Sequence, residues 1–178
     1  TLRNLGLQPE DVMGRIFGGI ETNSAAATHP KGKQDLAELD AMTKAGLERL
    51  YDFQHGDGGW GWWKQGESDH WMTAYVVWGL TLAKDAGIKL NDGVLERGVS
   101  FLDKTLVEEE ENPDMQVWML HALAAQNAQK TRLSPFQSKA FENLWANREK
   151  LNAYTRSLLA LSAHQFSFAD KAKTLVAN

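Results

Sequence analysis

The sequence has no cysteine and only 4 prolines among its 178 residues. Without cysteine, these residues cannot form disulfides, use a thiolate as a nucleophile or bind zinc through sulfur. No apolar run approaches the roughly 18 residues that a membrane-spanning helix needs. The first residues also lack the apolar core of a signal peptide. We therefore expect no direct membrane contact.

Neither sign of charge dominates the composition. The 19 basic and 23 acidic residues leave a net charge of -4, and no basic stripe is present that would follow a phosphate backbone. We therefore expect no nucleic-acid partner. The 43% of hydrophobic residues suffices for one globular domain with a substantial core. The chain begins at Thr1 and not at Met, and we expect it to be a piece of a longer protein.

Apolar residues recur at steps of three and four along most of the chain, which places them on one face of a helix. Leu36, Leu39, Leu47 and Leu50 follow this rule in the first helix that we predict. The predicted elements are helices at about 34–54 and 71–84, one from a cap at Asn91 or Asp92 to Leu106, one opened by Asn112 and Pro113, one from Ser134 and Pro135 through Trp145, one at 151–166, and a short tail helix after Asp170.

Three of these helices resemble one another at a period of about forty residues. An aromatic residue is followed five positions later by a leucine in the pairs Tyr75 and Leu80, Trp118 and Leu123, and Tyr154 and Leu159. The helix at 71–84 has almost no polar face, so we expect it to be buried nearly all round; we expect the other two to be buried as well, whereas the helices between them are amphipathic. A repeated pair of one buried and one amphipathic helix is what a double-layered helical ring or solenoid requires.

The glycine-rich stretch from His55 to Gly61 must be a connecting loop, because each glycine costs roughly 1 kcal/mol relative to alanine within a helix. Gln54, Gly58 and Trp60 resemble the Gln-Trp repeat of terpene cyclases and protein prenyltransferases, which share a toroid of six helical hairpins. In such a turn the amide satisfies backbone groups that the helix end leaves unpaired, and the indole covers them from water. The motif indicates a fold and not a chemistry.

The predicted fold is therefore all-α, made of helical hairpins as in an α/α toroid of the terpenoid cyclase and prenyltransferase type. The chain supplies about half of a full toroid. We expect one helical domain fragment over residues 1–178, with a Gly-rich lead-in at 1–33 and, at 34–178, about three helical hairpins plus a short tail helix.

A longer match points to one family. Residues 50–63, Leu-Tyr-Asp-Phe-Gln-His-Gly-Asp-Gly-Gly-Trp-Gly-Trp-Trp, and residues 71–77, Trp-Met-Thr-Ala-Tyr-Val-Val, resemble the thioester domain of bacterial alpha-2-macroglobulin-like proteins. There a helix rich in leucine and aromatic residues ends in Gln-x-x-Asp-Gly-Gly-x-Gly-x-Trp, and the next begins with Trp-Met-Thr-Ala-Tyr-Val. The match extends more loosely from Leu5 to about Leu123.

This resemblance implies an endopeptidase inhibitor that traps proteases in the periplasm or cell envelope. In the family, cleavage of a bait segment exposes a Cys–Gln thioester, which then acylates an amine of the protease. The resemblance places the Cys-x-Glu-Gln motif upstream of Thr1, and a parent that lacks this cysteine and traps by steric means is the open alternative. It implies a scaffold and shield role here, with no catalytic, cofactor-binding or metal residue. The implied partners are other domains of the parent chain and, through the parent, target proteases.

The residues that we expect to form a structural or interaction loop are Gln54, Asp57, Gly58, Gly59, Trp60, Trp62, Trp63 and Trp71. Two other functions remain open. One is a toroid enzyme, such as a polysaccharide lyase or terpene cyclase, with a pocket lined by the aromatic residues and by Asp57, Glu67 and Asp69. The other is a plain interaction module that binds through its concave inner surface.

Two single features have competing interpretations. Trp60, Trp62, Trp63 and Trp71 could form an aromatic cage for a cation or a sugar, although rings that plug a hairpin connection are more common. His121 lies in a helix predicted to be buried, and we expect it to be a hydrogen-bonded core residue. The histidines lack the i, i+4 spacing and the carboxylate company of a metal site.

Overall fold

The computed structural model describes residues 31–127 and 133–177, with side chains described from residue 37. The chain divides into two compact units, Thr1–Gly46 and Leu47–Asn178, and each is described by itself. Helix α2 (Lys31–Asp52) crosses the boundary between them. In the first unit, Leu39 and Met42 of this helix are exposed. The predicted lead-in at 1–33 lies outside the described residues except for its last three.

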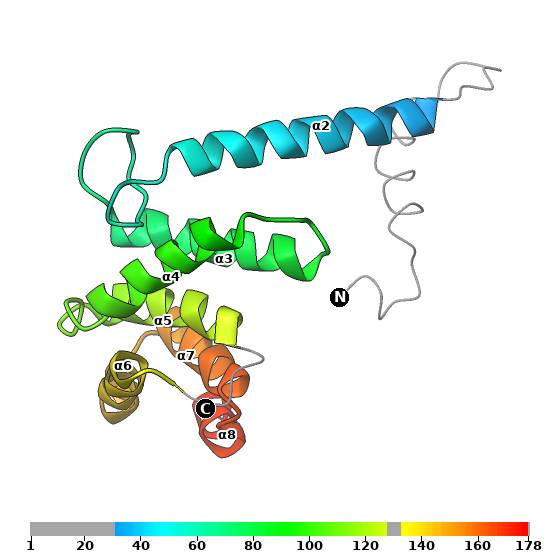
Figure 1. The fold of residues 1–178 in the computed structure, drawn as a ribbon. Coiled ribbons are helices and arrows are strands. Elements are labelled where there is room, and N and C mark those ends of the chain that lie inside the picture. Colours follow the sequence, from blue (N-terminus) through cyan, green and yellow to red (C-terminus); the bar gives the residue numbers. More distant parts are fainter. Residues whose placement is uncertain (1–30, 128–132, 178) are drawn as a thin grey trace. The chain divides into compact units, whose positions relative to one another are not determined.

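The second unit contains helices only, among the residues that are described. After the end of α2 they are α3 (His70–Asp85), α4 (Asp92–Thr105), α5 (Pro113–Asn127), α6 (Pro135–Ala146), a 3-10 turn at Arg148–Lys150, α7 (Ala153–Gln165) and α8 (Ala169–Val176) (Figure 1). The all-α prediction is confirmed, and each predicted helix is found within a few residues of its expected ends. The 3-10 turn was not predicted.

Side-chain caps explain where several of these helices begin. The Asp69 carboxylate accepts a hydrogen bond of 2.7 Å from the backbone N–H of Met72 at the start of α3. Ser134 and Gln137 form a reciprocal capping box at the start of α6. These contacts satisfy backbone N–H groups that the first turn of a helix leaves without partners. Gly87, at a φ of 89°, follows α3 in a conformation that side chains with a Cβ rarely adopt.

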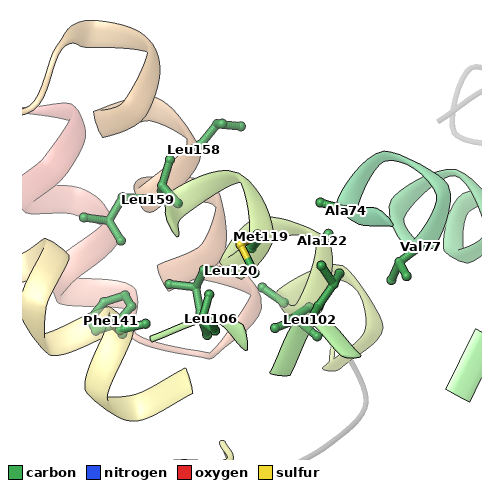
Figure 2. Close-up of a cluster of buried hydrophobic side chains, with 14 of the residues drawn as sticks. Ala74, Val77, Leu102, Leu106, Met119, Leu120, Ala122, Phe141, Leu158 and Leu159 are labelled. Carbon is green, nitrogen blue, oxygen red and sulfur yellow. The ribbon is translucent and has the colours of Figure 1, made fainter. Parts of the chain in front are cut away.

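The helices pair as three hairpins, α3 with α4, α5 with α6 and α7 with α8. Helices α3, α5 and α7 lie side by side in one row, and α4 and α6 pack against this row and against each other (Figure 1). Figure 2 shows the buried side chains of α5 between Ala74 and Val77 of α3 and Leu158 and Leu159 of α7. Helix α5 is therefore the centre of the core.

The burial predicted for the three repeated helices is confirmed only for α5. On α3, the side chains of Trp71, Tyr75 and Leu82 are exposed, although the helix was expected to be buried nearly all round. On α7, Tyr154 and Leu161 are exposed as well. The reason is that α5 has helix neighbours on both sides, whereas α3 and α7 each keep one face that no described helix covers.

His121 differs from its prediction. Its ring is buried, but its Nδ1 atom has no hydrogen-bond partner among the described residues. The ring instead packs against the indoles of Trp78 and Trp118, with centroid distances of 6.4 Å and 6.1 Å. Burial lowers the pKa of His121, because desolvation disfavours the charged ring. The neutral imidazole is thus held by aromatic packing and not by hydrogen bonds.

Candidate functional site

The segment between α2 and α3, residues 53–69, holds most of the predicted site residues and is called the α2–α3 loop below. Gln54 anchors its start. The side-chain amide of Gln54 donates hydrogen bonds of 2.8 Å to the carbonyl of Gly58 and 2.9 Å to that of Val94, and its oxygen accepts one from Arg97. One side chain thereby ties the loop to the first turns of α4.

Trp60 attaches the middle of the α2–α3 loop to the core through burial of its ring and two hydrogen bonds. Its side chain is 2% exposed, and its indole N–H donates a hydrogen bond of 2.8 Å to the carbonyl of Leu50 in the last turn of α2. Its backbone N–H donates to the hydroxyl of Thr73 over 2.8 Å. The indole itself thus satisfies a carbonyl that the end of α2 leaves unpaired.

The glycines of the loop are required by close backbone approaches. Gly58 has a φ of 96°, and a Cβ there would lie 2.7 Å from the carbonyl oxygen of Arg97. A Cβ on Gly59 would lie 2.6 Å from the hydroxyl of Ser68. A Cβ on Gly61 would lie 2.4 Å from the carbonyl oxygen of Glu67. The loop therefore folds back on itself more tightly than any residue with a side chain would allow.

Asp57 faces polar groups of the same loop. Its carboxylate accepts hydrogen bonds of 2.9 Å from the backbone N–H of Gly59 and 2.7 Å from the hydroxyl of Ser68. The pKa of Asp57 is lowered: partial burial acts to raise it, but the hydrogen bonds from Gly59 and Ser68 and the nearby ring of His55 together outweigh burial. The Asp57 carboxylate thus stabilises the bend of the chain.

Trp62 and Trp63 lie at the outer side of the loop and are 68% and 77% exposed. The main chain of Trp63 is nevertheless held, because its carbonyl is 2.9 Å from the Nε2 atom of His55. The next residue, Lys64, forms an ion pair of 2.5 Å with Asp52 at the end of α2. Two adjacent indoles are therefore presented to solvent, with a contact to the main-chain carbonyl of Trp63 and an ion pair at the next side chain.

Trp71 belongs to a different group of rings. It stacks on Tyr75 at a centroid distance of 5.5 Å and lies 6.4 Å from Trp118 of α5. Among the described residues, no ring contact joins Trp71 to Trp60, Trp62 or Trp63. The structure thus does not bring the four tryptophans together as an aromatic cage.

The three acidic residues considered for an enzyme occupy different environments. Asp57 holds the loop, Asp69 caps α3, and Glu67 is exposed. Ser68 lies between Asp57 and His55, at 2.7 Å and 3.0 Å. A Ser-His-Asp triad needs the histidine in the middle, so that it can take the proton of the serine. This order of contacts does not activate Ser68 as a nucleophile.

An open groove of the second unit lies away from the α2–α3 loop. It has a volume of about 650 Å³ and is lined by residues of α4, of α6 and of the ends of α3 and α5, among them Asp92, Asp103 and Gln137. Within the described part of the chain, no group of three or more His, Asp or Glu side chains is placed to hold a metal ion. No helix that the structure describes is both long and apolar enough to cross a bilayer.

Sequence reasoning missed Ser68, Thr73, Arg97 and Gly98 as parts of this site. A Cβ on Gly98 would lie 2.7 Å from the indole of Trp60 and 2.8 Å from Val77. A glycine in the middle of an amphipathic helix is a signal that could have revealed this close approach. The other three are common polar residues, and nothing in their sequence spacing indicates their hydrogen bonds to the loop.

The chain is similar to macroglobulins along about half of its length. Residues 27–111 match the family model described as the A-macroglobulin TED domain. An alpha-2-macroglobulin of Thermotoga maritima is 39% identical over 95 residues, which are 53% of this chain and 6% of that protein. An alpha-2-macroglobulin of Escherichia coli is 32% identical over 92 residues, 50% of this chain and 6% of that protein. The match thus involves a small part of each relative.

Two solved structures have the same fold. They are the crystal structure of native alpha-2-macroglobulin from Escherichia coli, spanning domain MG7 to the C-terminus, and a cryo-EM reconstruction of the native conformation of that protein. Each has a TM-score of 0.65 and covers 99% of this chain, at 21% and 22% identity. The chain covers 29% and 12% of theirs. The resemblance to the thioester domain of bacterial alpha-2-macroglobulins is therefore confirmed.

Proposed function

Starting from the confirmed resemblance of residues 27–111 to the macroglobulin TED domain, we propose that this chain is part of the thioester domain of a bacterial alpha-2-macroglobulin-like endopeptidase inhibitor, which traps proteases. Its own residues act as a scaffold and a shield and not as an enzyme. The observation that carries this proposal is the α2–α3 loop, which presents Trp62 and Trp63 to solvent while the His55 ring contacts the main-chain carbonyl of Trp63. From the same resemblance we propose that the parent acts in the periplasm or cell envelope.

The tryptophan pair is suited to contact another domain of the parent chain. Aromatic side chains carry much of the binding energy at protein interfaces. A pre-organised loop loses little conformational entropy on docking, and Gln54, Trp60 and Asp57 provide that organisation through their hydrogen bonds. In the uncleaved parent this contact keeps water and amines away from the thioester.

The uncovered face of α3 and α7 supports a place within a larger assembly. Its exposed side chains Trp71, Tyr75, Leu82, Tyr154 and Leu161 are all uncharged. Exposed large apolar side chains of this kind favour an interaction site. Other parts of the parent chain are the partners for this face, while target proteases meet the parent and are captured there.

The test uses a parent protein that carries the Cys-x-Glu-Gln motif, with Trp62→Ala or Trp63→Ala. Methylamine cleaves an accessible thioester and releases a thiol that can be titrated. We expect thiol release to become about tenfold faster, the factor that corresponds to the loss of a contact worth about 1.4 kcal/mol. Phe136→Ala in α6, where the ring is also exposed, is the matched control and should leave the rate unchanged.

One outcome would count against the shielding role, and another would change the mechanism of trapping. If both tryptophan variants release the thiol at the rate of the wild type, the shielding role is wrong. If the reading frame of the parent has no Cys-x-Glu-Gln motif upstream of Thr1, covalent trapping is excluded and steric trapping is the mechanism that remains.

A further inference from the structure

A continuous chain of side-chain contacts crosses the α2–α3 loop. The hydroxyl of Ser68 donates a hydrogen bond of 2.7 Å to the carboxylate of Asp57. The same hydroxyl oxygen lies 3.0 Å from the Nδ1 atom of His55. On its other side, the His55 ring places Nε2 at 2.9 Å from the carbonyl oxygen of Trp63. One imidazole therefore connects the Asp57 bend to the backbone of the exposed tryptophan pair.

The number of hydrogens available to these hydrogen-bonded side chains determines which protonation state of the His55 ring satisfies all the contacts. A carbonyl oxygen only accepts, so the contact with Trp63 requires a hydrogen on Nε2 of His55. An ionised carboxylate also only accepts, and Ser68 has a single hydroxyl hydrogen, which Asp57 takes. The contact between Ser68 and Nδ1 is then a hydrogen bond only if Nδ1 carries a hydrogen too. All contacts are satisfied together when the imidazole is doubly protonated.

A neutral ring cannot satisfy all of these contacts. With its hydrogen on Nε2, its Nδ1 lone pair faces the oxygen of Ser68, which has only one hydrogen for two acceptors. Either the bond from Ser68 to Asp57 or the contact from Ser68 to His55 is then lost. We infer that protonation of His55 closes this chain of contacts, so that the α2–α3 loop contains a pH-dependent latch, named here the His55 latch.

The backbone of the loop lies close to the side chains that form the latch. A Cβ on Gly61 would lie 3.1 Å from Cε1 of His55, and a Cβ on Gly59 would lie 2.6 Å from the hydroxyl of Ser68. Because the ring and the hydroxyl lie so close to the glycine backbone, loss of a contact in the latch acts on the backbone between Asp57 and Trp63.

The charged groups of the loop and of the helices beside it are mostly acidic. They are Asp52 of α2, Asp57, Lys64, Glu67 and Asp69 of the loop, and Arg97 of α4. Lys64 is paired with Asp52, and Arg97 donates to Gln54. The carboxylates of Asp57, Glu67 and Asp69 form no ion pair with a lysine or arginine among the described residues.

The His55 latch is independent of what the loop docks against, because it is a property of the free chain. Histidine side chains in general change charge between about pH 5 and 8, which is therefore the range over which the latch is tested. With the latch closed, the main-chain carbonyl of Trp63 is held by the His55 ring. With the latch open, the same backbone segment exchanges among conformations.

Nuclear magnetic resonance on the full chain, labelled with nitrogen-15, tests the latch between about pH 5.5 and about pH 8. At the lower pH we expect both ring nitrogens of His55 to carry hydrogen. The Gly59 amide, which donates to Asp57, should be protected from exchange there and should lose roughly fivefold in protection at the higher pH, the effect of one hydrogen bond. The ring signals of His55 and the amide signal of Gly59 should titrate with one midpoint.

Variants separate the latch from a general effect of pH. Ser68→Ala removes the bridging hydroxyl, and the Gly59 amide should then no longer follow the His55 ring. His55→Gln should abolish the titration, whereas His164→Gln, at an exposed position on α7, should leave it intact. If His55→Gln does not fold, Ser68→Ala and the wild type still decide the question. A His55 ring that carries one hydrogen throughout, or a Gly59 amide that titrates unchanged in Ser68→Ala, would overturn the inference.

Discussion

Substitution of Gly98 by alanine tests the packing of the α2–α3 loop against α4. Alanine in place of glycine within a helix normally stabilises it by about 1 kcal/mol. At Gly98, however, the new Cβ would lie 2.7 Å from Cζ3 of Trp60 and 2.8 Å from Cγ2 of Val77, both of which are buried. The indole cannot simply move away, because its N–H is bonded to the carbonyl of Leu50.

The expected magnitude follows from two opposing effects. Overpacking of a core costs about 1 to 3 kcal/mol, and the helix preference of alanine offsets about 1 kcal/mol of that. We therefore expect Gly98→Ala to lower the free energy of unfolding by about 0 to 2 kcal/mol. Gly79 is the matched control, since it lies in the middle of α3 and a Cβ there would have no neighbouring atom within 4 Å. Gly79→Ala should raise the free energy of unfolding by about 0.5 to 1 kcal/mol.

Urea denaturation of the chain measures both values under the same conditions. The free energies of unfolding of the two variants should differ by about 0.5 to 3 kcal/mol, with Gly79→Ala the more stable. Adding Val77→Ala to Gly98→Ala makes room for the new methyl group. The free energy of unfolding of the double variant should therefore fall by less than the sum of the decreases in the two single variants. Equal stability of Gly98→Ala and Gly79→Ala would refute the close approach of Trp60 to α4.

Two further predictions concern the loop. Trp60→Phe removes the indole N–H and leaves the carbonyl of Leu50 unpaired, so the free energy of unfolding measured in urea should fall by about 1 to 3 kcal/mol. An unchanged denaturation midpoint would contradict the role of the indole N–H. The lowered pKa of Asp57 means that the ionised carboxylate favours the folded state, so its contribution is present above the unfolded value, taken as 3.8, and is lost as pH falls through the lower folded value. The free energy of unfolding of Asp57→Asn should therefore fall less steeply with decreasing pH than that of the wild type. Identical pH dependences of the two proteins would exclude this contribution.

The helices could be predicted because their signals are local. Asp69, Ser134 and Pro135 mark helix starts through side-chain chemistry that acts within one turn, and the structure confirms α3 and α6 at these positions. The site was harder to predict, because its contacts join residues far apart in the chain. Gln54 and Val94 are separated by 40 positions, and no periodicity connects them. The interaction role of Trp62 and Trp63 stays a prediction.

By itself, the sequence determined the helix ranges, the glycine-rich loop and the family resemblance, since periodicity, capping residues and a contiguous motif are all properties of neighbouring residues. Only the tertiary structure decided which aromatic residues are buried. Trp60 and Trp62 stand two positions apart in the same loop, yet one is 2% and the other 68% exposed. Likewise, Tyr75 and Trp118 occupy equivalent places in the repeat, but only Trp118 lies on a helix with neighbours on both sides. Burial depends on which helices pack beside a residue, and hydropathy along the chain does not contain that information.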